Sequence, residues 1–335
     1  QIIPNFENKR LTPSVIQFED GERIFGSEAE EAFQEGERNC AAAFKRHMNS
    51  FDPCFYLDGK SYTAEDLSAM LLEHLKQDTE RRLHDRITEA VITVPAYFQS
   101  IPREATIRAA EKAGLKVKKL LDEPNAAALA YGLSHWRKNA LILVYDLGGG
   151  TFDVSLVKMM GDGNLQTIAT RGNDQLGGKN WDTCLKDLLI RKFSEEIGRP
   201  LDEDTDAVAT VFGMSETVKR KLTTVSSVPV TRYFRRSGNV TVTVSREEFD
   251  EVTYSLLSET GDLCKGVLSD ENASASQITD VLLIGGSTRM PQVSAYLQNM
   301  FGKKPLMSIN QDEAVALGAA IQATKAQDTY VDNQV

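Results

Sequence analysis

The chain alternates between apolar runs of strand length and stretches whose apolar residues recur at helical spacing. The predicted strands are residues 1–6, 12–18, 89–95, 115–124, 140–146, 151–157, 228–234, 239–245 and 280–284, with 165–171 as a further candidate. The predicted helices fall within residues 63–75, 102–113, 124–133, 176–193, 215–225, 246–268 and 310–325, and one more begins at Pro291. Strands separated by helices in both halves of the chain predict an α/β protein with two similar lobes.

Start and stop signals sharpen several of these elements. Residues Thr63-Ala-Glu-Asp66 form a capping-box sequence, and apolar residues at the spacing i, i+3, i+4 and i+8 follow it. Pro102 and Pro124 suit the first turns of two helices, and Gly114 suits the C′ position after the first of them. Residues 269–277, SDENASASQ, are the most loop-like stretch of the chain.

The stretch YDLGGGTFDVSLV, residues 145–157, interrupts a strand with three consecutive glycines. Gly148–Gly150 permit positive φ angles, and their N–H groups can converge around a small anion because no Cβ obstructs them. Asp146 can hold Mg²⁺ through water, and Thr151 and Asp153 bring a hydroxyl and a carboxylate to the same place. Taken alone, however, three glycines are better explained as a tight hairpin turn.

A second glycine pair, Gly285-Gly286, follows a predicted strand and stands at the start of a helix. Backbone without a Cβ can approach a flat ligand closely there, and the Arg289 guanidinium can stack on an aromatic base. A predicted helix carries Glu216, Lys219 and Arg220, which could hydrogen-bond a base and a ribose. A solvated face is the better explanation of that helix alone. A phosphate loop, a base-binding turn and two lobes together predict a nucleotide cleft.

The stretch GNDQLGGKN, Gly172–Asn180, resembles a P-loop only superficially. Five residues separate Gly172 from Gly178 where the P-loop has four, and Asn180 stands where a Ser or Thr would bind Mg²⁺. We therefore reject a P-loop, and the nucleotide hypothesis depends on the two glycine turns described above.

Composition narrows the choice of partners. The chain carries 48 acidic and 38 basic residues and a net charge of −10, which argues against nucleic acid because a phosphate backbone needs a basic face. No apolar run approaches the length of a membrane span, and no secretory leader is visible. The cysteines lie far apart without a CxxC pair, so reduced thiols and a cytoplasmic location are favoured over a zinc site.

Six blocks of the sequence resemble the seventy-kilodalton heat-shock chaperone family. In the family's order they are AVITVPAYF, AGLKVKKLLDEPNAAALAYG, VYDLGGGTFDVSLV, LGGKNWD, VLLIGGSTRMPQV and NQDEAVALGAAIQA, and they span most of the chain. Taken jointly they are highly specific to that family, although no single block is. The resemblance implies an α/β protein with the actin-like ATPase fold, in which two lobes of two subdomains each surround a nucleotide cleft.

The resemblance also implies a division of the chain. Lobe I would comprise residues 1–139, with a C-terminal helix 313–335 packing back on it, and lobe II would comprise residues 140–312. The upper subdomain of lobe I, about residues 16–85, is short against the family pattern, and that of lobe II would span about residues 178–257. The family's peptide-binding domain would be absent.

Single residues receive roles from the resemblance. Lys45 would orient the attacking water and the γ-phosphate, Glu123 would organise the metal and water shell, and Asp146 would bind Mg²⁺ through water. Thr151 and Asp153 complete the candidate catalytic residues. The candidate nucleotide-binding residues are Gly148, Gly149, Gly150, Glu216, Lys219, Arg220, Thr223, Gly285, Gly286, Ser287, Arg289 and Asp312. The implied ligands are ATP or ADP and Mg²⁺, with K⁺ as an additional cation.

The chain departs from the family pattern in several places. The family's first phosphate hairpin would lie just before residue 1, so we expect weak ATP hydrolysis from the sequence as given. Lys179 and Asn180 stand where the family usually has acidic residues, so nearby polar contacts are expected to differ. Ser100 replaces an acidic residue where J-domain co-chaperones dock, although Arg103 is kept, which leaves stimulation by such a partner open.

The sequence therefore predicts an ATP-binding and ATP-hydrolysing nucleotide switch of such a chaperone, which acts on client peptides through a separate domain. The implied partners are ATP, a J-domain co-chaperone and a nucleotide-exchange factor, with no nucleic acid and no membrane. One alternative is a non-hydrolysing nucleotide-binding regulator, which single-turnover hydrolysis would distinguish. Another is an actin-like filament protein or a sugar kinase, which tests of polymerisation and sugar phosphorylation would distinguish.

Overall fold

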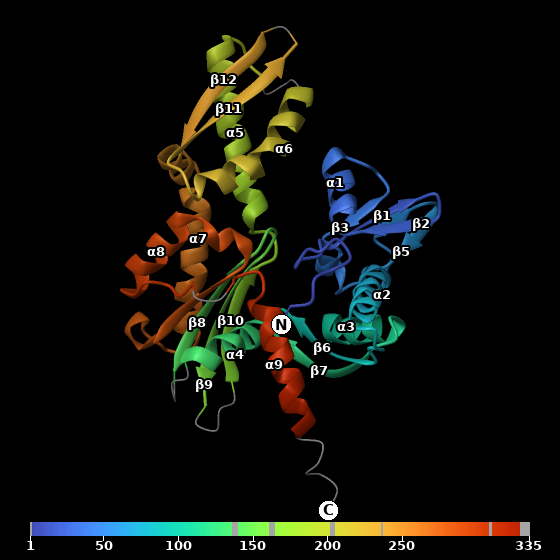
Figure 1. Cartoon of the computed structure of the whole chain (residues 1–335). Helices are drawn as coiled ribbons and strands as arrows, with labels where there is room; N and C mark the ends of the chain where they lie inside the picture. Colours follow the sequence, from blue (N-terminus) through green and yellow to red (C-terminus); the bar gives the residue numbers. More distant parts are fainter. Residues whose placement is uncertain are drawn as a thin grey trace, which may run out of the picture. The chain divides into compact units, whose positions relative to one another are not determined.

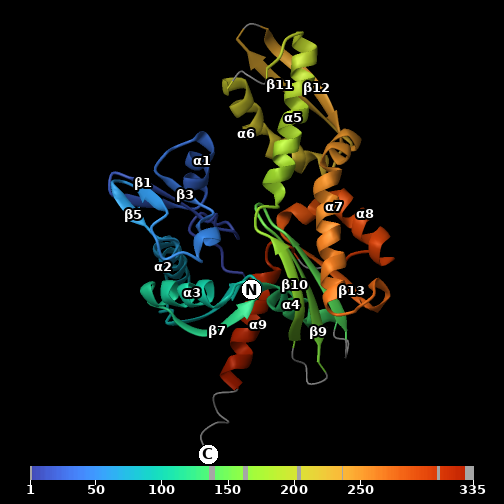
Figure 2. The same ribbon diagram turned by 180° about the vertical axis from the view of Figure 1, so that it is seen from behind.

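The computed structural model describes residues 2–135, 140–160, 165–201, 205–235, 237–307 and 310–328. Figure 1 shows its elements along the chain, and Figure 2 shows the same ribbon from behind. The chain forms two compact units, namely unit 1 (Gln1–Arg137 and Asp312–Val335) and unit 2 (Lys138–Gln311). The ends predicted for the two segments of lobe I, residues 139 and 335, lie outside the described residues.

Unit 1 combines short sheets with helices. Its strands are β1 (Val15–Glu19), β2 (Glu22–Phe25), β3 (Cys40–Ala42), β4 (Phe55–Leu57), β5 (Lys60–Tyr62), β6 (Glu89–Val94) and β7 (Lys116–Asp122). Its helices are α1 (Ser27–Glu35), the 3₁₀ helix η1 (Phe44–His47), α2 (Ala64–Leu83), α3 (Ser100–Lys112), α4 (Glu123–His135) and α9 (Ala314–Asp328). Strand β1 pairs antiparallel with β2 and β3, β4 pairs antiparallel with β5, and β6 and β7 are parallel.

The apolar core of unit 1 is built from residues of β1, β3, η1, α2 and β6, of which Ile16 and Leu67 are fully buried. The predicted capping box is present at the start of α2. Asp66 N donates to Thr63 Oγ1 at 3.1 Å, and Thr63 N donates to Asp66 Oδ2 at 3.2 Å. Because these bonds satisfy two backbone N–H groups at the helix start, they fix where α2 begins and which face meets the core.

Helices α4 and α9 pack against each other, although much of the chain separates them in sequence. A Cβ on Gly318 of α9 would overlap the carbonyl oxygen of Ala126 in α4. Ala126, Ala127 and Ala128 are fully buried. Small residues on both helices therefore allow the two backbones to approach this closely.

Unit 2 is built on a four-stranded sheet and a separate hairpin. Its strands are β8 (Leu141–Leu147), β9 (Phe152–Met159), β10 (Leu165–Asn173), β11 (Ser227–Phe234), β12 (Gly238–Ser245) and β13 (Asp280–Ile284). Its helices are α5 (Gly178–Ile197), α6 (Thr205–Leu222), α7 (Arg246–Asp270), α8 (Pro291–Phe301) and the 3₁₀ helices η2 (Ala275–Gln277) and η3 (Gly286–Arg289). The sheet order is β10-β9-β8-β13, with β13 parallel to β8 and the other pairs antiparallel.

The core of unit 2 joins the sheet to its helices. Helix α7 packs on β9 and β10, and α5 and α6 lie beside the β11–β12 hairpin in both views (Figures 1 and 2). The buried Tyr145 hydroxyl of β8 donates to Thr260 Oγ1 of α7 at 2.7 Å. Burial raises the pKa of Tyr145 well above its ordinary value, so its hydroxyl remains a donor at neutral pH. Strand β8, an inner strand of the sheet, and helix α7 are thus joined by a buried polar contact.

The N-terminal segment differs from the prediction, because residues 2–6 form no strand. Pro4 cannot donate to a strand ladder, and Asn5 closes a local turn instead. Asn5 N donates to Lys9 O at 2.8 Å, and Lys9 N donates to Asn5 Oδ1 at 2.9 Å. The second predicted strand is present as β1 but begins at Val15. Local hydrogen bonds between Asn5 and Lys9 therefore take the place of the expected strand pairing.

The predicted free thiols are present. Cys40, Cys54, Cys184 and Cys264 form no disulfide, and burial raises the pKa of the Cys264 thiol, which therefore stays protonated. Among the helices that the structure describes, none has both the length and the apolar character that crossing a membrane requires.

Candidate functional site

The glycine turn of the sequence forms the connection between β8 and β9 in unit 2. Strand β8 ends at Leu147, β9 begins at Phe152, and Gly148 N donates to Thr151 O at 3.0 Å across the turn. Asp146 and Asp153 lie opposite each other in the strand register. The predicted interruption of the strand is therefore a hairpin turn that carries two carboxylates at its base.

A second glycine segment packs against this turn. Gly178 N donates to Gly148 O at 3.0 Å, and Lys179 N donates to Gly149 O at 2.8 Å. A Cβ on Gly177 would lie 2.5 Å from backbone atoms of Gly150. Real Cβ atoms do not approach backbone so closely, so only glycine at position 177 allows this arrangement.

A third glycine segment completes the arrangement. Gly285 has a φ of 83°, and a Cβ there would overlap the Leu147 carbonyl oxygen and lie 2.8 Å from Asp146 Oδ1. The Ser287 hydroxyl donates to Gly148 O at 3.0 Å. We name these three segments, residues 148–150, 177–178 and 285–287, the glycine junction. Backbone from three places in the sequence meets there, and the Ser287 hydroxyl joins two of the segments.

Gly177 and Gly178 were not among the predicted site residues, although they belong to the block LGGKNWD. Two adjacent glycines at the start of a helix are the signal in the sequence that indicates such close packing. Gly172 belongs to β10 and pairs with Asp153 of β9, so it is not part of a loop before the helix. The segment that was compared with a P-loop therefore begins in a strand, at Gly172, and only its glycines 177 and 178 contact the glycine turn.

Lys219 is buried, although the prediction placed it on a charged helix face near a base and ribose. Its ammonium lies 2.8 Å from Asp182 Oδ1 and donates to Gly178 O at 3.0 Å. Asp182 is also buried, and burial raises the pKa of its carboxyl, although the Lys219 charge acts in the opposite direction. The lysine is therefore bonded to the protein's own backbone beside the glycine junction.

The other predicted adenosine contacts lie on α6 and η3. Arg220 Nη2 bonds Glu216 Oε1 at 2.6 Å on the exposed side of α6, and the Thr223 hydroxyl donates to Arg220 O at 2.6 Å. Arg289 is exposed on η3, and its Nη2 donates to Asn310 Oδ1 at 3.3 Å. The structure describes these side chains without a ligand, so their adenosine roles stay predictions.

Two candidate catalytic residues meet within unit 1. Lys45 lies on η1, Glu123 lies at the start of α4, and Lys45 Nζ is 2.5 Å from Glu123 Oε1. The lysine side chain is 54% exposed and the glutamate side chain 17% exposed. Asp312, which precedes α9, is a half-buried residue of the same unit. The structure thus places a solvated ammonium against a partly sheltered carboxylate.

The backbone N–H groups of the glycine turn are of the kind that binds phosphate, and the nearby Asp146 carboxylate is of the kind that binds Mg²⁺. The exposed Gly149 lies between the half-buried Gly148 and Gly150, and a Cβ on Gly149 would meet nothing within 4 Å. Within the described residues no group of three or more His, Cys, Asp or Glu could hold a metal. Mg²⁺ commonly takes one or two carboxylates, with phosphate and water oxygens completing its shell, so Asp146 fits as such a ligand.

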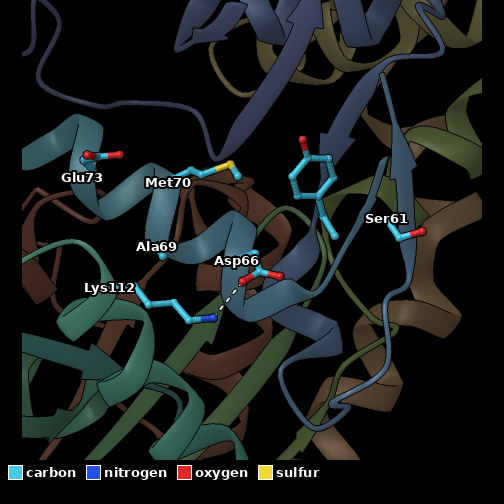
Figure 3. A pocket seen from close by; sticks show the side chains of 7 residues that line it. Ser61, Asp66, Ala69, Met70, Glu73 and Lys112 are labelled. Carbon is cyan, nitrogen blue, oxygen red and sulfur yellow. Dashed lines mark hydrogen bonds and ion pairs between the residues drawn. The ribbon is translucent and has the colours of Figure 1, made fainter. Parts of the chain in front are cut away.

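A shallow hollow of about 400 Å³ lies elsewhere in unit 1 (Figure 3). It is lined by Ser61, Tyr62, Asp66, Ala69, Met70, Glu73 and Lys112. The Lys112 ammonium lies 2.8 Å from Asp66 Oδ1 and 2.8 Å from Glu65 Oε1, and Glu73 Oε2 lies 3.7 Å from Arg23 Nη1. These charges neutralise one another, and the hollow contains none of the predicted site residues. We therefore assign it no part in the candidate site.

A protein-family model matches most of the chain. The family described as Hsp70 protein matches the chain over residues 1–56 and 52–332. The two matched ranges cover well over half of the sequence and contain every residue of the glycine junction. The chain belongs to the Hsp70 protein family.

Proposed function

We propose that the chain binds ATP and hydrolyses it to ADP and phosphate, as the nucleotide switch of a chaperone. Membership of the Hsp70 family implies an ATPase with the actin-like fold, and the mixed α/β architecture agrees with that fold. The glycine junction is the observation that carries the proposal for this chain. Its turn 148–150 presents backbone where no Cβ obstructs a phosphate, and close packing of residues 177–178 and 285–287 holds that turn in place.

In this proposal the backbone of Gly148–Gly150 and the Thr151 hydroxyl bind phosphate oxygens. Asp146 would hold Mg²⁺ through water, and the ion would supply positive charge at the phosphates. The Lys45 ammonium, which is held by the Glu123 carboxylate, orients the attacking water. Phosphoryl transfer depends mainly on positioning and electrostatic stabilisation, and charged groups fixed by a partner supply both.

The wider function is also part of the proposal. Hydrolysis would control the binding of client peptides by a separate domain, and a J-domain co-chaperone and an exchange factor would set the rate of the cycle. The proposed location is cytoplasmic, and K⁺ would be an additional cation at the phosphates. The family match supports the chaperone assignment.

The experiment measures ATP and ADP binding by calorimetry in Mg²⁺ buffer, followed by single-turnover release of phosphate, all on the natural full-length protein. Binding accompanied by hydrolysis supports the proposal. Tight binding without hydrolysis would identify a nucleotide-binding regulator instead. Absence of binding at millimolar nucleotide would refute the proposal.

A further inference from the structure

The first N–H groups of α5 bond the glycine turn, residues 148–150. The opening N–H groups of a helix have no acceptor within the helix, so they need one elsewhere. Gly178 N donates to Gly148 O at 3.0 Å, and Lys179 N donates to Gly149 O at 2.8 Å. Two consecutive carbonyl groups of the turn are therefore held toward the start of α5.

These two bonds also set the direction of N–H groups in the turn. A peptide group is planar and trans, so its C=O and N–H bonds point in opposite directions. Because the carbonyls of Gly148 and Gly149 face α5, the N–H groups of Gly149 and Gly150 point away from that helix. Gly149 is exposed, and a Cβ there would meet nothing within 4 Å. Successive N–H groups that converge in this way suit an anion.

Asn180 holds the start of α5 in this position. Its Oδ1 accepts from Gly177 N at 2.8 Å, and its own backbone N donates to Gly177 O at 2.8 Å. Both bonds join the N-cap residue to the third residue of the helix, as in a capping box, with the Gly177 carbonyl in place of a side-chain acceptor. Gly177 in turn lies against Gly150, where a Cβ on Gly177 would come within 2.5 Å. Asn180 thus fixes a residue that is packed directly on the glycine turn.

Two roles of Asn180 have different consequences for ligands. A helix cap alone would stabilise α5 and leave the preference among ligands unchanged. A cap that also sets the direction of N–H groups in the glycine turn would affect ligands with phosphates most. The half-buried Asn180 amide is neutral, so it supplies its acceptor oxygen without adding a negative charge beside a phosphate.

We propose that the start of α5, residues 177–180, orients the N–H groups of the glycine turn toward a phosphate, and that Asn180 is the positioning residue of this arrangement. The inference rests on the proposed ATP function and adds to it a residue that acts through the backbone of the turn. A nucleoside diphosphate reaches the turn through its phosphates and therefore depends on Asn180, whereas adenosine has no group to place there.

The test compares the affinities of ADP and adenosine for the natural full-length protein with and without Asn180→Ala. Calorimetric titration with Mg·ADP and with adenosine gives both dissociation constants. We expect the ADP affinity to fall by about fivefold, because one hydrogen bond that orients the turn is lost, and the adenosine affinity to change by less than about twofold. Asn239→Ala is the matched control, because Asn239 is an exposed residue of β12 in the same unit. Both affinities should be unchanged in that control.

A second pair of variants tests the backbone bond directly. Lys179→Pro removes the N–H that donates to Gly149 O, and proline is tolerated in the first turn of a helix. Lys179→Ala keeps that N–H and is the reference. The ADP affinity of the proline variant should be about fivefold or more below that of the alanine variant, with adenosine affinities that agree within about twofold.

Asn180→Asp separates positioning from folding, because a carboxylate retains an oxygen that can accept from Gly177 N. This variant should recover most of the ADP affinity that Asn180→Ala loses. A lower melting temperature in Asn180→Ala without a selective loss of ADP affinity would show that Asn180 only caps the helix, and would overturn the inference.

The remaining outcomes separate this inference from the proposed function. Equal losses of ADP and adenosine affinity in Asn180→Ala would show that the residue supports the whole site and would overturn the inference alone. Unchanged affinities for both ligands would also overturn it. If the unchanged protein binds neither ligand, the proposed ATP function fails, and the inference fails with it.

Discussion

The glycine junction of unit 2 and the Lys45–Glu123 pair of unit 1 are two candidate site regions built from different materials. The junction consists of backbone from three sequence segments, packed so closely that a Cβ at Gly177 or Gly285 would meet backbone atoms. The pair consists of two side chains, and one of them is 54% exposed. Packing therefore constrains the residues at the junction, whereas water surrounds much of the lysine.

Substitutions in the two regions should therefore have different effects. At a glycine of the junction there is no side chain to remove, but a larger residue forces the packed segments apart and costs stability. A solvated side chain can be truncated with little effect on folding, while any role in the reaction is lost with it. The following predictions, from the largest expected effect to the smallest, test that contrast.

The largest effect is expected for Lys45→Ala in the natural full-length protein. Loss of an ammonium that orients water and phosphate should slow single-turnover ATP hydrolysis by roughly 10²–10³-fold, about 3–4 kcal/mol of barrier, with binding retained. The control is Lys60→Ala, which removes another exposed lysine of unit 1. An unchanged rate in Lys45→Ala would show that the Lys45–Glu123 ion pair has no part in hydrolysis.

The second prediction concerns Gly177→Ala. A Cβ there would lie 2.5 Å from Gly150 backbone atoms, so the junction must open, and the free energy of unfolding should fall by about 2–3 kcal/mol. Gly149→Ala is the matched control, because a Cβ on Gly149 meets nothing within 4 Å. Urea denaturation without nucleotide measures both. Similar values for the two variants would remove the distinction between a packed and an open glycine.

A third and smaller effect is expected for Arg289→Ala. If its guanidinium stacks on adenine, its removal should weaken ATP binding by about 1 kcal/mol, which is roughly fivefold in Kd. The exposed Arg235, also in unit 2, provides the control variant Arg235→Ala. Calorimetric titration measures both Kd values, and equal affinities would place Arg289 outside the base site.

The smallest effect concerns an ion-pair network of unit 1 that includes neither Lys45 nor Glu123. Burial acts to raise the pKa of Glu65, but hydrogen bonds from Lys112 and Arg108 outweigh it and lower that pKa below 4.5. A carboxylate with a lowered pKa stabilises the fold above its unfolded pKa, and this contribution disappears as the pH falls below about 4.5. Lys112→Met should therefore flatten the acid limb of stability against pH, by less than about 1 kcal/mol.

The control for that network is Lys119→Met, which removes an exposed lysine from β7. Urea denaturation from about pH 7 down to about pH 3, a range that includes the region below about pH 4.5 in which Glu65 loses its charge, measures both variants. An acid limb that keeps its slope in Lys112→Met would show that the network adds nothing to stability.

Local signals in the sequence were sufficient for most secondary structure. The capping box starts α2 at Ala64, Pro124 lies in the first turn of α4, and Pro291 opens α8. Gly114 has a positive φ directly after the residue that caps α3. Each signal acts over a few residues, so the sequence states it directly.

Two kinds of contact could not be predicted in the same way: a local turn in place of a strand, and packing between distant segments. Residues 1–6 were predicted as a strand, but Asn5 and Lys9 form hydrogen bonds with each other in a local turn. At the candidate site, the sequence pointed to Gly148–Gly150 and to Gly285, yet it did not show that Gly177 would lie against them. Burial of Lys219 was equally hidden, because a helix with three basic residues in its last turn looks solvated until its tertiary neighbours are known.

The close crossing of α4 and α9 has a consequence for synthesis on the ribosome. Unit 2 is one continuous segment, so all of its residues have been translated when the chain reaches position 311. Unit 1 is split, and Gly318 of α9 must reach Ala126 of α4 before this part is complete. Unit 1 can thus be completed only after all of unit 2 has been translated, and α4 lacks the helix that packs on it while the segment between Ala126 and Gly318 is made.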